Sequence, residues 1–131
     1  MRLSRGSLLA GALFGAFAVA LGAFGAHALR GVLDERALGI WHTAVDYQFW
    51  HALALLGVGV LARSRADTML RWAAIAFVIG VLAFCGSLYA LALGAPRPVG
   101  AITPLGGAAF IIGWLALAVH AWCDGEHQGM S

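Results

Sequence analysis

The sequence predicts an all-α membrane protein, a bundle of four transmembrane helices that run up-down-up-down. Apolar residues make up 62% of the 131 residues and charged residues only 11%, with a mean hydropathy of +0.87. A soluble domain carries about 25% charged residues, so this chain cannot cover its surface with groups that suit water. The apolar residues also form four runs, each close to the ~20 residues that a bilayer core requires. This composition argues against a disordered chain, a nucleic-acid binder and a cytosolic enzyme.

The four runs cover residues 7–29, 44–62, 72–93 and 102–122 of what we expect to be one membrane domain over residues 1–131. They lack the alternation of a β-barrel and show no broken helix, and helices satisfy their own backbone hydrogen bonds in lipid. The connections are short, so consecutive helices should be antiparallel. The first run exceeds the about 7–15 apolar residues of a signal peptide, so we expect it to be retained as a span.

A short interfacial segment over residues 30–41 joins the first two runs. Asp34 is expected to cap a helix there, and Trp41 is expected to anchor that helix at the membrane surface. At the fourth run, Thr103 is the predicted N-cap and Pro104 the first helical residue.

The arginines predict the orientation of the bundle. Arg2, Arg5, Arg63, Arg65 and Arg71 fall on one side of the membrane, and Arg30, Arg36 and Arg97 on the other. The side with more positive loops faces the cytoplasm. Both termini are therefore expected to be cytoplasmic.

Small residues form a stripe along three of the four runs, at alternating spacings of four and three. The stripes are Gly11, Gly15, Ala18, Gly22 and Gly25; Gly80, Ala83, Ser87, Ala90 and Gly94; and Gly106, Ala109, Gly113, Ala116 and His120. Small residues let helix backbones approach closely in lipid. We expect these stripes to pack the bundle or to join a homo-oligomer.

Polar residues gather at the outer end of the predicted bundle. The candidate binding residues are His27, Asp46, Tyr47, Gln48, His51, Ser87, Tyr89 and Thr103. Unpaired polar groups are costly in lipid, so a cluster that spans four helices should be hydrogen-bonded together. His51 lies deepest of the ionisable residues in the second run and is the sharpest candidate. The alternative is that the cluster only holds the helices together.

A metal site and a catalytic site are both disfavoured. His42 and His51 are nine residues apart, on opposite sides of a helix, so one ion cannot use both. The chain carries no G-x-S-x-G or H-E-x-x-H motif. Cys85 and Cys123 belong to no metal-ligand spacing and lie too far apart for a disulfide. We expect no metal, no cofactor, no catalytic residue and no nucleic-acid partner.

Four segments together carry a family resemblance. They are GAFGAHAL at 22–29, TAVDYQFWHALALL at 43–56, GSLYALALG at 86–94, and ITPLGG at 102–107 followed by Gly113-Trp114. In this order they resemble the DUF423 family of small multi-span membrane proteins. That resemblance implies a bacterial inner-membrane protein without an established activity, and it supplies no catalytic residues. Cys85 stands where the family pattern leads us to expect serine.

Two functions follow as hypotheses. The first is a non-enzymatic membrane protein whose outer polar cluster binds a lipid headgroup, a small molecule or a partner helix among membrane lipids. The alternative is a small transporter or an oligomeric channel-like protein, proton-linked through His51 and Asp46. Against transport, the cytoplasmic half offers no polar path.

Overall fold

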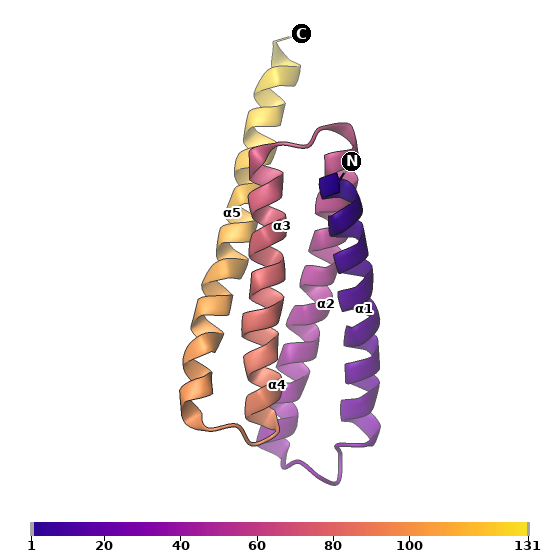
Figure 1. Ribbon diagram of the computed structural model, residues 1–131, viewed down its shortest axis with the longest axis vertical. Coiled ribbons are helices and arrows are strands. Elements are labelled where there is room, and N and C mark those ends of the chain that lie inside the picture. The colour runs from indigo at the N-terminus through magenta and orange to yellow at the C-terminus, as the bar shows by residue number, and fades with distance from the viewer. Residues whose placement is uncertain (1, 131) are drawn as a thin grey trace.

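The computed structural model describes residues 2–130, and all of its regular elements are helical (Figure 1). Four helical segments are long and apolar enough to cross a membrane: Arg2–His27, Glu35–Ser64, Thr68–Ala92 and Arg97–Gly129. Consecutive segments run in opposite directions. The predicted four-helix membrane bundle is confirmed.

The third and fourth segments are not uniform helices. The elements in chain order are α1 (Arg2–His27), α2 (Glu35–Ser64), α3 (Thr68–Gly80), the π-helical turn η1 (Val81–Cys85), α4 (Gly86–Ala92), the 3₁₀ turn η2 (Arg97–Ala101) and α5 (Ile102–Gly129). Gly94, with φ of +100°, lies in the turn between α4 and η2, in a conformation that suits glycine.

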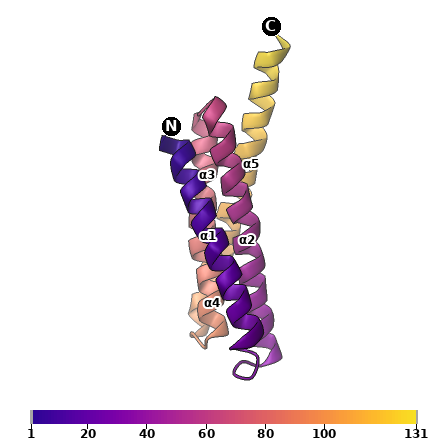
Figure 2. The same cartoon turned by 90° about the vertical axis from the view of Figure 1, so that its right-hand side faces the viewer.

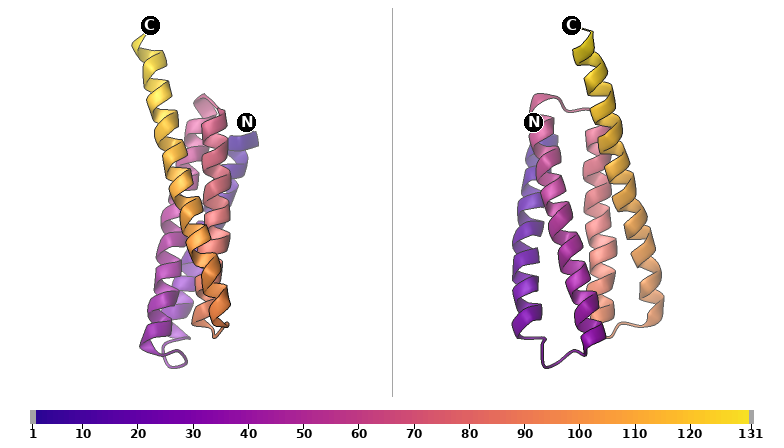
Figure 3. Two further views of the ribbon diagram at one scale, coloured as in Figure 1. Left: turned by 90° about the vertical axis from the view of Figure 1, so that its left-hand side faces the viewer. Right: turned by 180° about the vertical axis from the view of Figure 1, so that it is seen from behind.

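The helices pack as a row rather than as a closed square. α1 packs along α2, α2 packs on α3, η1 and α4, and α3 and η1 pack on α5 (Figure 3). Within residues 2–130 the α1 and α3 backbones approach at few points, and those of α2 and α5 do not meet. The row therefore leaves an opening between α1 and α3 on one side and another between α2 and α5 on the opposite side.

The two ends of the bundle differ. Both chain termini and the turn between α2 and α3 lie at one end, which we call the terminal end (Figure 1). The turns after α1 and α4 lie at the other, the loop end. At the terminal end α5 continues past the other helices (Figure 2). In this extension His127 and Gln128 hydrogen-bond one turn back to Cys123 and Asp124.

Helix caps account for where α2 and α3 begin. The Ala37 N–H donates to Asp34 Oδ1 at 2.8 Å, as predicted, so α2 starts well before the apolar run at 44. Asp67 caps α3 in the same way, with the Leu70 N–H at 2.9 Å.

Two predicted details at the helix ends are wrong. Thr103 caps nothing, because η2 leads directly into α5 and the N-cap position is Ala101, without a side-chain hydrogen bond. Trp41 is not an interfacial anchor: it is 3% exposed, and its Nε1 donates to Leu21 O at 2.9 Å. Gly25 makes room for this indole, since a Cβ there would lie 2.6 Å from Trp41 Nε1.

Glycines set the spacing of the helices, as the stripes predict. A Cβ on Gly11 would lie 2.8 Å from Ala52 O of α2, and one on Gly113 would lie 2.6 Å from the Phe77 ring. Gly106 lies directly on the backbone of Phe84 in η1. These glycines pack helices of the same chain. A homo-oligomer formed through the stripes stays a prediction.

The third segment contains the π-helical turn η1 but stays one continuous helix from Thr68 to Ala92. In a π turn the backbone hydrogen bonds run from residue i to residue i+5 instead of i+4. Here the Ser87 hydroxyl donates to Phe84 O at 3.0 Å. The same turn lies with the backbone of Phe84 against Gly106 of α5.

Candidate functional site

His51 lies near the middle of α2, deeper in the bundle than the other candidate residues on that helix. It is 4% exposed. Its Nδ1 lies 2.7 Å from Tyr47 O, and its Nε2 lies 3.1 Å from Trp114 Nε1 of α5. A carbonyl only accepts and an indole N–H only donates, so Nδ1 carries the proton and Nε2 accepts. His51 is therefore a neutral imidazole with both nitrogens in use.

Four aromatic rings pack around His51. The Phe110 ring stacks on the imidazole with centroids 3.6 Å apart, and the Tyr47 ring stacks at 6.0 Å. The Phe77 and Trp114 rings lie at 5.5 and 5.9 Å. Interlocked aromatic rings of this kind fix the orientation of the imidazole between α2 and α5.

A cavity of about 780 Å³ lies beside these rings, at the opening where the α2 and α5 backbones do not meet. We call it the aromatic cavity; it is lined by Tyr47, Trp50, His51, Phe84, Pro104, Gly107, Ala108, Phe110, Ile111 and Trp114. Trp50 and Trp114 are 52% and 49% exposed. The cavity is thus reached from the side of the bundle, where the lipid lies, rather than from the loop end.

Gln48 and Tyr89 link three helices behind the cavity. The Gln48 amide donates from Nε2 to Phe14 O of α1 at 2.9 Å, and its Oε1 accepts from the Tyr89 hydroxyl of α4 at 2.7 Å. Gln48 is 4% exposed. An unpaired amide would be costly here, so this pair acts as a structural connection.

Ser87 and Thr103 form the second polar pair. Their hydroxyl oxygens lie 2.6 Å apart and join α4 to α5. Ser87 uses its single proton on Phe84 O, so the Thr103 hydroxyl donates to Ser87 Oγ. The predicted mutual hydrogen bonding therefore exists, but as separate pairs rather than as one network.

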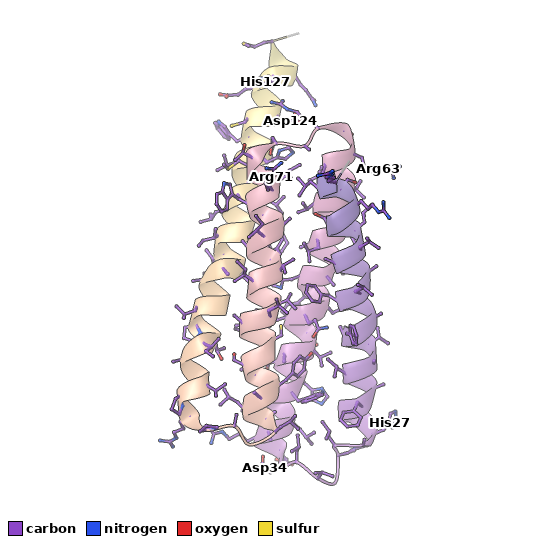
Figure 4. All side chains as sticks on the ribbon, viewed as in Figure 1. His27, Asp34, Arg63, Arg71, Asp124 and His127 are labelled. Atoms are coloured by element: carbon purple, nitrogen blue, oxygen red, sulfur yellow. The ribbon has the colours of Figure 1, made fainter. Side chains whose placement is uncertain are left out.

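His27 and Asp46 lie outside these pairs. Both are exposed, and His27, the last residue of α1, points away from the bundle (Figure 4). In the part of the chain that the structure describes, neither side chain has a hydrogen-bond or ion-pair partner. Asp46 makes no contact of that kind with Arg30, Arg36 or Arg97. The structure thus brings together six of the eight candidates in three groups and leaves these two apart.

The hydroxyl of Tyr47 is the polar group of the aromatic cavity that the protein leaves unused. It hydrogen-bonds to no other group within residues 2–130, although the ring packs on Phe84 and Phe110 with centroids 4.6 and 6.1 Å apart. A lipid environment offers few partners to such a group. Tyr47 can therefore donate to a molecule that enters the cavity.

Sequence reasoning missed Phe110 and Trp114, which hold His51. A signal was present: the two aromatic residues are four apart and so share one helix face. That face also includes the predicted stripe residues Gly106 and Gly113. The stripe predicted close helix packing, and the aromatic side chains beside it were not considered as partners of His51.

A further polar pair was missed at the terminal end. His120 Nδ1 lies 2.5 Å from Asp67 Oδ2, which joins α5 to the start of α3. Burial alone would raise the pKa of Asp67, but the hydrogen bonds from Leu70 and His120 and the charges of His120 and Arg65 lower it below its usual value.

Among the described residues, no three His, Cys, Asp or Glu side chains gather as a metal site would require.

Comparison with known proteins settles the family. The family model described as "Protein of unknown function (DUF423)" matches residues 21–107. The chain belongs to the DUF423 family. It is 45% identical over 112 residues to a UPF0382 membrane protein of Staphylococcus epidermidis, which covers 86% of this chain and 91% of that protein.

Further relatives of the chain come from other bacteria. The UPF0382 membrane protein YwdK of Bacillus subtilis is 43% identical over 118 residues, 87% of this chain and 94% of its own. The UPF0382 inner membrane protein YgdD of Escherichia coli is 39% identical over 118 residues, 90% of each chain. No solved structure matches the chain. These names describe membrane proteins and state no activity, so function must be argued from the site.

Proposed function

We propose that this DUF423 protein is a non-enzymatic membrane protein whose aromatic cavity holds the apolar chain of a lipid or of a lipid-like small molecule. The observation that carries the proposal is the cavity of about 780 Å³ between α2 and α5. Ligand pockets commonly measure about 300–1,000 Å³ and are mostly apolar with few polar groups. Five aromatic side chains and a neutral imidazole provide such a lining.

The hydrogen bonds of the polar cluster favour an apolar chain over a headgroup. Gln48, Tyr89, Ser87 and Thr103 already satisfy one another and nearby carbonyls. They have little capacity left for a charged headgroup. The Tyr47 hydroxyl is the exception, and it suits an ester or other carbonyl oxygen near the start of an acyl chain.

Transport is less well supported by the same geometry. A proton carrier needs a titratable group with access to water, and both nitrogens of His51 are bonded to Tyr47 O and Trp114. Asp46, the other residue that the transport hypothesis invokes, lies apart from His51 on an exposed face. The transporter alternative stays a prediction without a structural observation in its favour.

The cavity is tested by filling it. Ala108 lines the cavity and is exposed, whereas Ala118 is exposed on the same helix and lies outside this cavity. Native mass spectrometry of protein extracted gently with its own lipids should show bound lipid-sized masses for the wild type and for Ala118→Trp, and fewer for Ala108→Trp. Equal retention by both variants would contradict the proposal.

We also propose that the protein lies in the bacterial inner membrane with the terminal end in the cytoplasm. The terminal end carries five arginines and the loop end three, and positive residues favour the cytoplasmic side. Cys123 is exposed near the terminal end and Cys85 is buried, and both are free.

The native cysteines test this orientation without added tags. A membrane-impermeant maleimide applied to intact spheroplasts should leave the protein unlabelled, and permeabilised spheroplasts should label Cys123. Cys123→Ser should abolish the label, because Cys85 is covered. Labelling in intact spheroplasts would reverse the assignment.

A further inference from the structure

A second opening lies at the terminal end, on the side of the row opposite the aromatic cavity. It is a groove of about 300 Å³ between α1 and α3, whose backbones approach at few points. We call it the arginine groove; its lining includes Arg2, Gly6, Ser7 and Ala10 of α1 and Ile75 and Ile79 of α3. The deeper part of the groove is lined by apolar side chains, and its mouth, the opening at the terminal end, carries the positive charge of Arg2.

Ser7 is the feature of this groove that points to a ligand. The residue is 4% exposed, and its Oγ is the buried side-chain oxygen or nitrogen of residues 2–130 that has no hydrogen-bond partner. A buried hydroxyl without a partner is costly. Its neighbour on the same helix, Ser4, is equally buried but donates to Gly59 O of α2 at 2.6 Å. Ser7 lines the groove, and a rotation about χ1 turns its hydroxyl between staggered positions.

The charge at the mouth selects the kind of ligand. Arg2 lines the groove. Arg71 lies one turn before Ile75 on the same face of α3, at the terminal end (Figure 4). Neither guanidinium has an ion-pair partner among the described residues, and no acidic residue lines the groove. An anion is the complement of this mouth.

We infer that the arginine groove binds one anionic glycerophospholipid from the leaflet at the terminal end. The phosphate lies at Arg2, with Arg71 beside it, and an acyl chain runs along Ile75 and Ile79. Ser7 lies five residues below Arg2, about 7.5 Å deeper along α1. That is the level of the ester carbonyls beneath a phosphate, where the Ser7 hydroxyl finds its acceptor. The groove is separate from the aromatic cavity and does not depend on the function proposed for it.

Charge selectivity is tested with full-length protein in vesicles of equal phosphatidylglycerol and phosphatidylcholine. After mild detergent extraction, native mass spectrometry gives the ratio of the two lipids retained. Arg2→Gln should lower the ratio of phosphatidylglycerol to phosphatidylcholine roughly fivefold, the worth of one arginine near a membrane surface. Arg5→Gln removes the same charge from the same helix end but outside the groove, so it should leave the ratio unchanged. An equal fall in both variants would overturn the inference in favour of general surface charge.

Occupancy of the groove is tested separately. A Cβ on Gly6 would meet nothing within 4 Å, so Gly6→Leu fills the groove without a clash, and its thermal unfolding midpoint in lipid-free detergent should match the wild type. It should retain neither lipid at this site. Ser7→Ala should lower the retention of both lipids and keep their ratio, whereas Ser4→Ala should leave retention unchanged. Wild-type retention by Gly6→Leu, or by Ser7→Ala, would overturn the inference.

Discussion

The two ends of this bundle place their polar side chains in opposite situations. At the loop end the buried polar groups are uncharged and bond to one another, as Gln48 does to Tyr89 and Ser87 to Thr103. At the terminal end Arg2 and Arg71 have no ion-pair partner within residues 2–130, and the buried Ser7 hydroxyl has no hydrogen-bond partner. The charged pairs at this end are Asp67 with His120 and the exposed Arg65 with Asp124. Polar residues in a membrane helix are informative when the protein leaves them unpaired. Because the polar groups of the loop-end cluster are already paired, the openings between the helices are the better candidates for binding sites.

The two openings differ in the same way. The aromatic cavity has ring walls and a single unused hydroxyl on Tyr47. The arginine groove has aliphatic walls, a charged mouth and the unpaired Ser7. The aromatic cavity therefore suits the acyl chain of a lipid with any headgroup. The arginine groove suits a lipid whose headgroup is anionic, together with its acyl chain.

The largest effect is expected where α5 meets the π turn. A Cβ on Gly106 would collide with the Phe84 backbone, whereas one on Gly107 would lie 3.8 Å from Phe84 Cδ2, an ordinary contact. Gly106→Ala should lower the free energy of unfolding by about 3 kcal/mol, as overpacking does. Gly107→Ala should leave it nearly unchanged. Reversible unfolding in mixed micelles measures both, and equal stability of the two variants would show that η1 does not govern this contact.

The next effect tests the loop-end hydrogen bonds. Gln48→Leu leaves the Tyr89 hydroxyl without its partner and removes the bond from α2 to Phe14 O of α1, so it should cost about 2 kcal/mol of unfolding free energy. Thr43→Val removes an exposed bond to Gly39 O within the same helix and should cost far less. If the two variants lost similar amounts of unfolding free energy, the hydrogen bonds of Gln48 would stabilise the bundle no more than an exposed bond within one helix does.

The pH response should separate the two ends. The pKa of Asp67 is lowered in the folded protein, so its carboxylate stabilises the fold above the unfolded pKa of about 3.9, and this contribution is lost as pH falls through the folded value. Asp67→Asn keeps an acceptor for the Leu70 N–H but removes the titration. The wild-type thermal midpoint should fall more steeply than that of Asp67→Asn from pH 5 to pH 3. Parallel curves would place the acid response elsewhere.

The smallest effect is expected at the exposed terminal-end ion pair. Arg65 Nη1 and Asp124 Oδ1 lie 3.5 Å apart, and their side chains are 50% and 38% exposed. Asp124→Asn should change the unfolding free energy by less than about 0.5 kcal/mol. A loss as large as that of Gln48→Leu would show that the extension of α5 is held to the α2–α3 turn.

Much of this fold could be predicted because lipid imposes simple rules. Apolar run length gives the four spans, and the stripes give the close contacts at Gly11, Gly106 and Gly113. Helix ends were less accessible, because Asp67 and the 3₁₀ turn η2 determine them and hydropathy does not report caps. The π turn left no trace in composition, since its five residues are as apolar as their neighbours.

The site was predictable in its residues but not in its geometry. The sequence places Tyr47, Gln48 and His51 at one level. The partners of Gln48 and His51 nevertheless come from three other helices: Phe14, Tyr89 and Trp114. Which helix faces come into contact depends on the arrangement of the helices. A row of helices and a closed square bring different faces together, and the sequence does not distinguish the two arrangements. Ser7 shows the same limit, because its lack of a partner is visible only once α1 is placed against α2 and α3.

Photo-crosslinking with a phospholipid that carries a diazirine within its acyl chain tests the central claim most directly, because it reports where chains reside. Peptide mass spectrometry after irradiation should find adducts concentrated on α2 near Tyr47 and Trp50 and on α5 near Phe110 and Trp114, and Ala108→Trp should remove them. Adducts spread evenly over exposed positions such as Leu13 and Leu115, unchanged by Ala108→Trp, would contradict the account.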